Sequence, residues 1–181
     1  MEDTVYTAYM TSPLGRIVLR AKNERIIECT WADSSADLAQ EARNHLDADM
    51  PCESAIEVPQ SDEPPCLVQA RLQLEEYFAG NRQLFSCPIS INGTAFQMAV
   101  WSELSSIPYG TTISYSTLAS RLGNAKAVRA VAQACHRNPI AIIIPCHRVI
   151  GADGSMTGYA GGIERKARLI EMEQSGGEPK I

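Results

Sequence analysis

Hydrophobic and polar positions alternate near the start of the chain in three short runs, as they do along half-buried β-strands. The runs span residues 4–10, 15–21 and 25–32, and they are rich in β-branched and aromatic side chains. Ser-Pro-Leu-Gly and Lys-Asn-Glu separate them, and both stretches are typical of turns. The pattern predicts a small antiparallel sheet of about three strands.

Helical spacing follows the three strand-like runs. Apolar residues three and four positions apart predict one helix over residues 35–49 and a second over residues 67–81, which Gly80 would end. Between them, residues 50–65 contain four prolines and are predicted to form a surface loop. Strands followed by helices indicate the α+β class.

The second half of the chain has a different pattern, and Asn-Gly-Thr at residues 92–94 marks the expected boundary. We expect domains over residues 1–92 and 93–175, followed by a flexible tail at 176–181. Phe96, Val100 and Leu104 give a helix at the start of the second domain one apolar face. Further helices are expected over the segments 113–123, 125–138 and 163–173.

The segments 113–123 and 125–138 are separated by a very short connection at Gly123, as in a helix-turn-helix. A plain helical hairpin explains the same pattern equally well. The second segment is rich in alanine, and Lys126 and Arg129 project from it. Such a thin helix suits close approach to a narrow minor groove or close packing within the domain.

Charge is distributed unevenly between the two predicted domains. The whole chain has a net charge of −5. Residues 1–93 carry 7 basic and 15 acidic side chains, whereas residues 94–175 carry 8 basic and 5 acidic ones. The first half is therefore acidic and the second half basic. A basic second half is compatible with binding to nucleic acid, although the chain as a whole is acidic.

Six cysteines occur in the chain, without a C-x-x-C pair or a zinc-ribbon spacing. The acidic start lacks the basic and apolar regions of a signal peptide, and no stretch approaches the ~18 apolar residues of a membrane span. We therefore expect a cytoplasmic protein that makes no membrane contact, with most thiols reduced and buried.

The stretch Pro145-Cys146-His147-Arg148 follows an apolar run that is typical of a buried strand. Pro145 is poorly tolerated inside a sheet, so the strand is expected to end there. A reactive thiol needs a neighbouring base or cation, and the base needs an acceptor behind it, for which the last helix offers Glu171 and Glu173. A structural buried thiol and a Cys-His hydrolase are the alternatives.

Four stretches of the chain resemble one family in order and spacing. They are "SPLG", "EYFAGN", "AFQMAVWSELSSIPYGTTISYSTLASRLGNAKAVRAV" and "NPIAIIIPCHRVIGADGSMTGYAGGIERKARLIEME". The chain resembles the O6-alkylguanine-DNA alkyltransferases (methylated-DNA–protein-cysteine methyltransferases), in their stand-alone bacterial form. Only residues 32–65 and 176–181 lie outside the resemblance. It implies a ribonuclease-H-like sheet domain, then a mainly helical domain that binds DNA and carries out alkyl transfer beside a short active-site strand.

The resemblance also implies a role for each matching position of the reactive site. Cys146 would accept the alkyl group, His147 would take its proton through a water, and Glu173 would hydrogen-bond the imidazole. Asn138 would tie the recognition helix to the active-site strand, and Tyr115 would donate a proton toward the leaving guanine. Arg148 is expected to have a structural role.

Further positions match residues that contact DNA or line the base pocket. Arg129 would enter the duplex and fill the space left by a flipped nucleotide. Flipping takes the target base out of the stack, so that an enzyme can act on it. The remaining DNA positions are Tyr115, Ser116, Asn124, Lys126 and Ala127. The pocket positions are Pro145, Tyr159 and Ala160, the last of which stands where some relatives have Ser.

The implied reaction is direct reversal of DNA damage. The alkyl group of O6-alkylguanine, and less readily that of O4-alkylthymine, would pass from double-stranded DNA bound through its minor groove to Cys146. Each molecule would react once, without a cofactor. A monomer is expected, with cooperative binding along DNA as an open alternative. Alkyltransferase-like proteins, which bind the lesion without enzymatic activity, are disfavoured because they lack the acceptor cysteine.

Some relatives hold a structural zinc in the first domain. The corresponding positions here, Ala21 and Ile26-Ile27, offer no ligands, so no zinc is predicted. Chance chelation is the alternative, and it would draw on Cys29, Cys52, Cys66, Cys87 and His45.

Overall fold

The computed structural model describes residues 4–32 and 56–176 of the chain. Three strands follow one another in the first segment: β1 (Val5–Ser12), β2 (Gly15–Lys22) and β3 (Arg25–Trp31). β2 pairs antiparallel with both neighbours, so the predicted meander is confirmed. The helix expected over residues 35–49 lies outside the described residues.

The proline-rich loop contains a short strand, β4 (Ile56–Glu57), that the sequence pattern does not reveal. β4 pairs parallel with β1 and extends the sheet to the order β3-β2-β1-β4. A single turn of 3-10 helix, η1 (Gln60–Asp62), follows it. The sheet is therefore mixed at one edge, and a strand of two residues is too short to produce a recognisable alternation.

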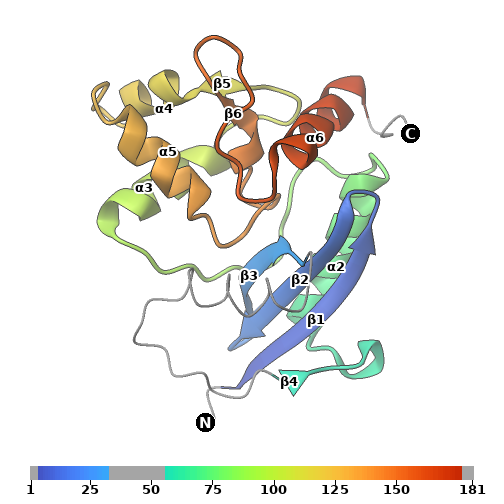
Figure 1. Ribbon diagram of the computed structural model, residues 1–181. Coiled ribbons are helices and arrows are strands. Elements are labelled where there is room, and N and C mark those ends of the chain that lie inside the picture. Colours follow the sequence, from blue (N-terminus) through green and yellow to red (C-terminus); the bar gives the residue numbers. More distant parts are fainter. Residues whose placement is uncertain (1–3, 33–55, 177–181) are drawn as a thin grey trace.

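One face of the sheet is covered by helix α2 (Pro65–Phe78), which lies against the strands in Figure 1. Its buried side chains are Cys66, Leu67, Ala70, Gln73, Leu74, Tyr77 and Phe78. The helix ends where predicted, and Gly80 adopts a φ of 75°, a left-handed conformation that glycine accepts without strain.

The rest of the chain is mainly helical and lies above the sheet in the view of Figure 1. Its helices are α3 (Ala95–Ser105), α4 (Tyr115–Arg121), α5 (Val128–His136) and α6 (Ile163–Ser175). Thr94 and Gln97 form a capping box at the start of α3. The predicted pair of neighbouring helices is confirmed: α4 and α5 pack on each other, and both are shorter than the sequence pattern indicates.

The expected buried strand leading to Pro145 is wrong. Ile140 forms only an isolated bridge with Cys29, and the chain then turns, with a φ of 71° at Ile142. Asn138 fixes this turn, because its side chain accepts from the Ile140 N–H (3.0 Å) and donates to the Ile144 carbonyl (2.8 Å). An apolar run of this length fits a buried turn as well as a strand.

After the turn, the predicted reactive stretch forms a single 3-10 turn, η2 (Cys146–Arg148). The strand lies after the cysteine: β6 (Val149–Ile150) pairs in parallel with β5 (Ile113–Ser114). Cys146 is therefore presented from a tight turn.

The sheet and the helices share one continuous hydrophobic core. The backbone joins them as well: the Cys29 N–H donates to the Pro139 carbonyl (2.9 Å), and the Ala141 N–H donates to the Cys29 carbonyl (2.7 Å). All five cysteines within the described residues are free and buried, as predicted. In that same part of the chain, no helix is both long and apolar enough to cross a bilayer.

Candidate active site

Cys146 opens the 3-10 turn η2, and only 6% of its surface is exposed. The Asn138 amide, which fixes the preceding turn, also donates to Cys146 Sγ at 3.2 Å. Burial raises the pKa of the Cys146 thiol, while this hydrogen bond and the charge of Lys166 act in the opposite direction. The thiol form is favoured at rest, so a base must remove the proton when the nucleophile is needed.

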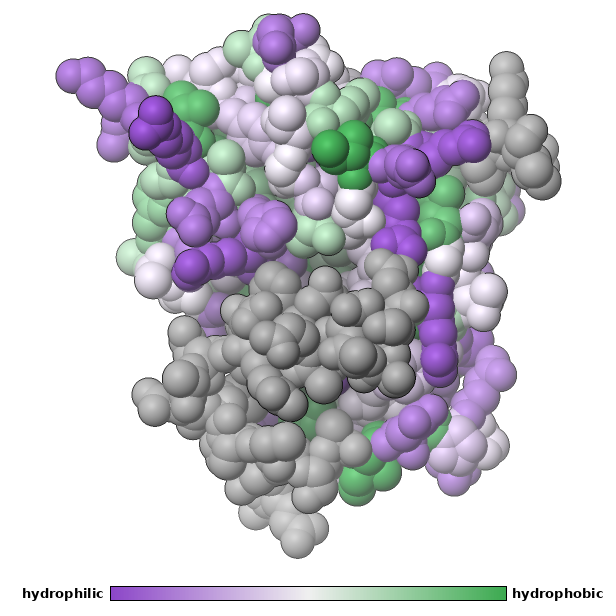
Figure 2. Space-filling view, viewed as in Figure 1, coloured by the Kyte–Doolittle hydropathy of each residue, from purple (hydrophilic) through white to green (hydrophobic). Residues whose placement is uncertain are grey.

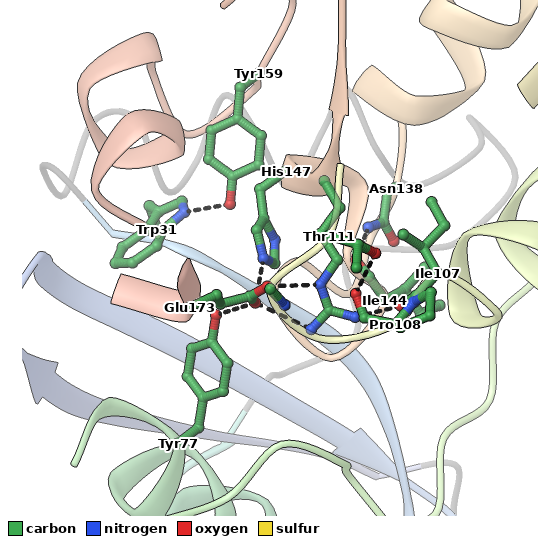
Figure 3. Close-up of polar contacts among 12 residues, drawn as sticks. Trp31, Tyr77, Ile107, Pro108, Thr111, Asn138, Ile144, His147, Tyr159 and Glu173 are labelled. Carbon is green, nitrogen blue, oxygen red and sulfur yellow. Dashed lines mark hydrogen bonds and ion pairs between the residues drawn. The ribbon is translucent and has the colours of Figure 1, made fainter. Parts of the chain in front are cut away.

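His147 is fully buried and pairs with the carboxylate of Glu173, with Nε2 and Oε1 2.8 Å apart (Figure 3). Burial lowers the pKa of His147 despite this partner. An ionised carboxylate only accepts hydrogen bonds, so the neutral ring carries its hydrogen on Nε2 and leaves Nδ1 as an acceptor. Nδ1 has no hydrogen-bond partner among the described residues. The ring is thus prepared to take up a proton at Nδ1.

Glu173 is the centre of a buried network, and Figure 3 shows its carboxylate beside Tyr77 and His147. Besides His147, it accepts hydrogen bonds from the Tyr77 hydroxyl (2.7 Å), the Gly110 N–H (3.0 Å) and Arg148 Nε (2.9 Å) and Nη2 (3.0 Å). Burial alone would raise the pKa of Glu173, but His147 and Arg148 hold that pKa far below its usual range. Glu171, the other acceptor that the sequence offered, is exposed.

Arg148 also donates from Nη1 to the Ile107 carbonyl at 2.6 Å. Its guanidinium thereby joins η2 and α6 to the loop after α3. Because it holds the carboxylate that orients His147, the structure agrees with the expected structural role.

Lys166 is a residue of this site that the sequence analysis missed. Its side chain is fully buried, and Nζ donates to the Thr157 carbonyl (2.7 Å) and the Tyr115 hydroxyl (3.3 Å). Burial lowers the pKa of Lys166, and the nearby Cys146 opposes this shift. The sequence contains a signal for it: Lys166 stands three residues before Leu169 and seven before Glu173, on the buried face of the last helix.

Two tyrosines from separate segments lie close to Cys146. The Tyr115 hydroxyl, at the start of α4, donates to the Thr157 carbonyl at 2.9 Å. Tyr159 is buried in the loop before α6, whereas its neighbour Ala160 is exposed. Burial, with a contribution from Cys146, raises the pKa of both tyrosines well above the usual value, so both hydroxyls keep their protons at neutral pH. Pro145 is buried directly before the thiol.

The predicted DNA-contacting residues lie on and between α4 and α5, where Figure 2 shows hydrophilic side chains projecting from the surface. Asn124, Lys126 and Arg129 are exposed, and Ser116 and Ala127 are half-buried. Tyr115 differs from them, because it points into the protein with 6% of its surface exposed.

We also searched the described residues for side chains that could bind a metal ion. Across residues 4–32 and 56–176, no group of three or more His, Cys, Asp or Glu side chains is arranged to hold a metal ion. The side chains that gather around Cys146 are an imidazole, a carboxylate, an ammonium group and two phenols.

The site combines a buried thiol with a histidine–glutamate pair, and the neighbouring helices α4 and α5 expose basic and amide side chains. This combination indicates a protein with cysteine chemistry and a nucleic-acid partner. Residues 5–91 match the ribonuclease-like domain of 6-O-methylguanine DNA methyltransferase, and residues 95–175 match its DNA binding domain. The chain belongs to this family of methylated-DNA–protein-cysteine methyltransferases.

Individual relatives cover nearly the whole chain. The methylated-DNA–protein-cysteine methyltransferase of Methanosarcina acetivorans is 40% identical over 94% of this chain and 99% of its own length. The constitutive enzyme of Bacillus subtilis is 41% identical over 93% and 95%. A crystal structure of Mycobacterium tuberculosis OGT in complex with DNA superposes with a TM-score of 0.80 at 35% identity, over 96% of this chain and 95% of that one.

Proposed function

We propose that the chain transfers the alkyl group of O6-alkylguanine in DNA to Sγ of Cys146. Its family places it among the enzymes of direct-reversal DNA repair, with DNA as partner. The observation that carries the proposal is a buried Cys146 thiol that Asn138 holds by a hydrogen bond and that is followed directly in the chain by His147, the partner of Glu173. This arrangement supplies a nucleophile, a base and the acceptor that orients the base.

Proton transfer from the thiol comes first in the proposed mechanism. Nδ1 of His147 accepts the Cys146 proton through a water, and Glu173 stabilises the resulting imidazolium. The positive charge of Lys166 stabilises the thiolate. Asn138 holds the sulfur in place through its amide hydrogen.

Alkyl transfer follows. The thiolate attacks the O6-bound carbon, so that a sulfur–carbon bond forms as the carbon–oxygen bond breaks and its electron pair passes to the guanine. The Tyr115 hydroxyl donates a proton to the departing purine, and Lys166, which already donates to the Tyr115 oxygen, stabilises the phenolate. The thioether product has no good leaving group, so each molecule reacts once and no cofactor takes part.

DNA binding is proposed for the surface formed by α4 and α5. Arg129 would enter the minor groove and fill the space of the flipped nucleotide, and the neighbouring DNA positions are Ser116, Asn124, Lys126 and Ala127. A base must leave the stack before its O6 substituent reaches a buried thiol. Tyr159, Ala160 and Pro145 would line the pocket that receives it, and O4-alkylthymine is proposed as a poorer substrate. A monomer is the proposed binding unit.

Stoichiometry tests the proposed function. With a tenfold excess of duplex oligonucleotide containing O6-methylguanine, we expect repaired guanine to reach one equivalent per protein molecule and then stop. Quantifying guanine and O6-methylguanine in the digested DNA measures the plateau. Continued turnover beyond one equivalent, or no repair at all, would contradict the proposal.

Replacing Arg129 by alanine should separate DNA handling from chemistry. We expect transfer from duplex DNA to slow by at least roughly tenfold, because a flipped base costs a few kcal/mol that the inserted side chain partly offsets. Reaction with the free base O6-benzylguanine should stay close to wild type. Arg25→Ala, which removes an exposed arginine from β3, is the matched charge control. Equal losses on both substrates would refute the flipping role of Arg129.

A further inference from the structure

Trp31, the last residue of β3, reaches from the sheet to the loop that precedes α6. Its indole Nε1 donates to the hydroxyl of Tyr159 at 3.3 Å, and both side chains are buried (Figure 3). The two residues are 128 positions apart in the chain. The sheet half therefore contacts a residue of the proposed base pocket directly.

Arg165, in the first turn of α6, fastens the same contact from the other side. Its guanidinium carbon lies 4.7 Å from the centre of the Trp31 ring, within range of a cation–π interaction. Nε donates to the Leu14 carbonyl in the β1–β2 turn (2.9 Å), and Nη1 donates to the Gly161 carbonyl (3.1 Å). One side chain thus connects β3, the β1–β2 turn and the loop that carries Tyr159.

Two glycines make room for this arrangement. A Cβ atom at Gly161 would lie 2.3 Å from Cδ1 of Trp31, and one at Gly15 would lie 2.9 Å from Nη2 of Arg165. A side chain at Gly161 would displace Trp31, and one at Gly15 would displace the end of the Arg165 side chain. The indole rests directly on the backbone of the pocket loop, which limits how far the loop can move.

We infer that Trp31 and Arg165 are positioning residues for alkyl transfer, and that they hold the loop and orient the Tyr159 hydroxyl toward the pocket. This inference rests on the proposed transfer to Cys146. A tyrosine hydroxyl has one hydrogen to donate, and the indole N–H can only donate. Because Trp31 donates to the Tyr159 oxygen, the hydroxyl hydrogen of Tyr159 must point elsewhere. It is then available to a DNA base in the pocket or to the sulfur of Cys146.

The proposal gives the acidic sheet half a part in the reaction. Small displacements of positioning groups slow reactions by large factors, because the reacting atoms must approach within about 3–3.5 Å. Neither Trp31 nor Arg165 belongs to the proposed DNA surface on α4 and α5. Their loss should therefore lower the rate of transfer and leave DNA affinity unchanged.

The test uses the full chain with Trp31→Phe, Trp31→Ala, Arg165→Gln and the double change Trp31→Ala with Arg165→Gln. Arg16→Gln is the matched control, because Arg16 makes a similar cation–π contact with the Tyr9 ring at 4.0 Å. Three quantities are measured: the single-turnover transfer rate, the Kd for an O6-methylguanine duplex in a Cys146→Ser background, and Tm. The rate and the Kd are measured well below the Tm of each variant.

We expect Trp31→Ala and Arg165→Gln each to slow transfer roughly tenfold at unchanged Kd. The double variant should be little slower than either single one, because both act through the same loop. Trp31→Phe keeps a ring under Arg165 and should lose less. Arg16→Gln should transfer at the wild-type rate.

The inference is overturned if transfer from the Trp31 and Arg165 variants stays at the wild-type rate, or if rate and Kd change together. It is also overturned if Arg16→Gln slows transfer equally, which would reveal a general effect of stability. An inactive wild-type protein would instead refute the proposed function itself.

Discussion

Replacing Glu173 by alanine should lower the free energy of unfolding by about 3–5 kcal/mol, which is the usual loss when one partner of a buried ion pair is removed. The Glu173 carboxylate accepts from Tyr77, Gly110, His147 and Arg148. Without it, the Arg148 guanidinium stays buried without a counter-charge, and the Tyr77 hydroxyl loses its acceptor. Urea unfolding followed by circular dichroism measures the difference.

Glu171→Ala is the matched control, because Glu171 lies on the same helix, is exposed and forms a long ion pair with Arg168 at 3.7 Å. We expect it to change the unfolding free energy by no more than about 0.5 kcal/mol. An alanine at position 173 with equally little effect would show that the network does not stabilise the fold.

The same carboxylate makes stability depend on pH. The pKa of Glu173 in the folded protein lies far below the ~4.3 of an unfolded chain, so the unfolded state binds more protons in acid. Its contribution is therefore fully present above that value and is lost as the pH falls toward the folded-state pKa. His147, whose pKa is also lowered, adds a loss in the same direction as the pH falls below ~6.5.

Much of this fold follows from local pattern. The three strands of the meander and α2 have the spacing of half-buried elements, and Gly80 stops α2 where a left-handed residue is needed. The segment through Ile142 to Ile144 does not follow from local pattern. The hydrophobicity of this segment indicates that it is buried. The hydrogen bonds of Asn138 stabilise the buried segment as a turn.

The candidate site divides in the same way. A thiol and an imidazole adjoin twice in the chain, at Cys135-His136 and at Cys146-His147, and it is the second pair that follows an apolar run and a proline. The choice of Glu173 over Glu171 is settled by which face of α6 is buried. The contact of Trp31 with Tyr159 depends on how the sheet docks against the helices. The spacing of residues along a single sequence does not predict that docking.

Replacing Cys146 by serine should abolish alkyl transfer while preserving the fold. A serine side chain has nearly the same shape and can accept the hydrogen bond that Asn138 now donates to sulfur. A hydroxyl, however, ionises far less readily than a thiol and is a weak nucleophile at neutral pH. We expect no repaired guanine, with binding to the O6-methylguanine duplex retained.

Cys135→Ala is the appropriate control for that variant. Cys135 is another buried thiol and lies on α5. It is close to the site, because it and Cys146 both affect the pKa of Lys166. Burial, with an added contribution from Cys146, raises the pKa of the Cys135 thiol well above its usual value, and no base hydrogen-bonds it within the described residues. The Cys135→Ala variant should still repair one equivalent of O6-methylguanine.

The acceptor can be identified directly by mass spectrometry of wild-type protein after reaction with an O6-methylguanine duplex. The proposed function predicts that intact protein gains the mass of one methyl group, and that peptide mapping places this group on Cys146. A methyl group on any other residue, or an unchanged mass after the DNA has been repaired, would contradict Cys146 as the acceptor.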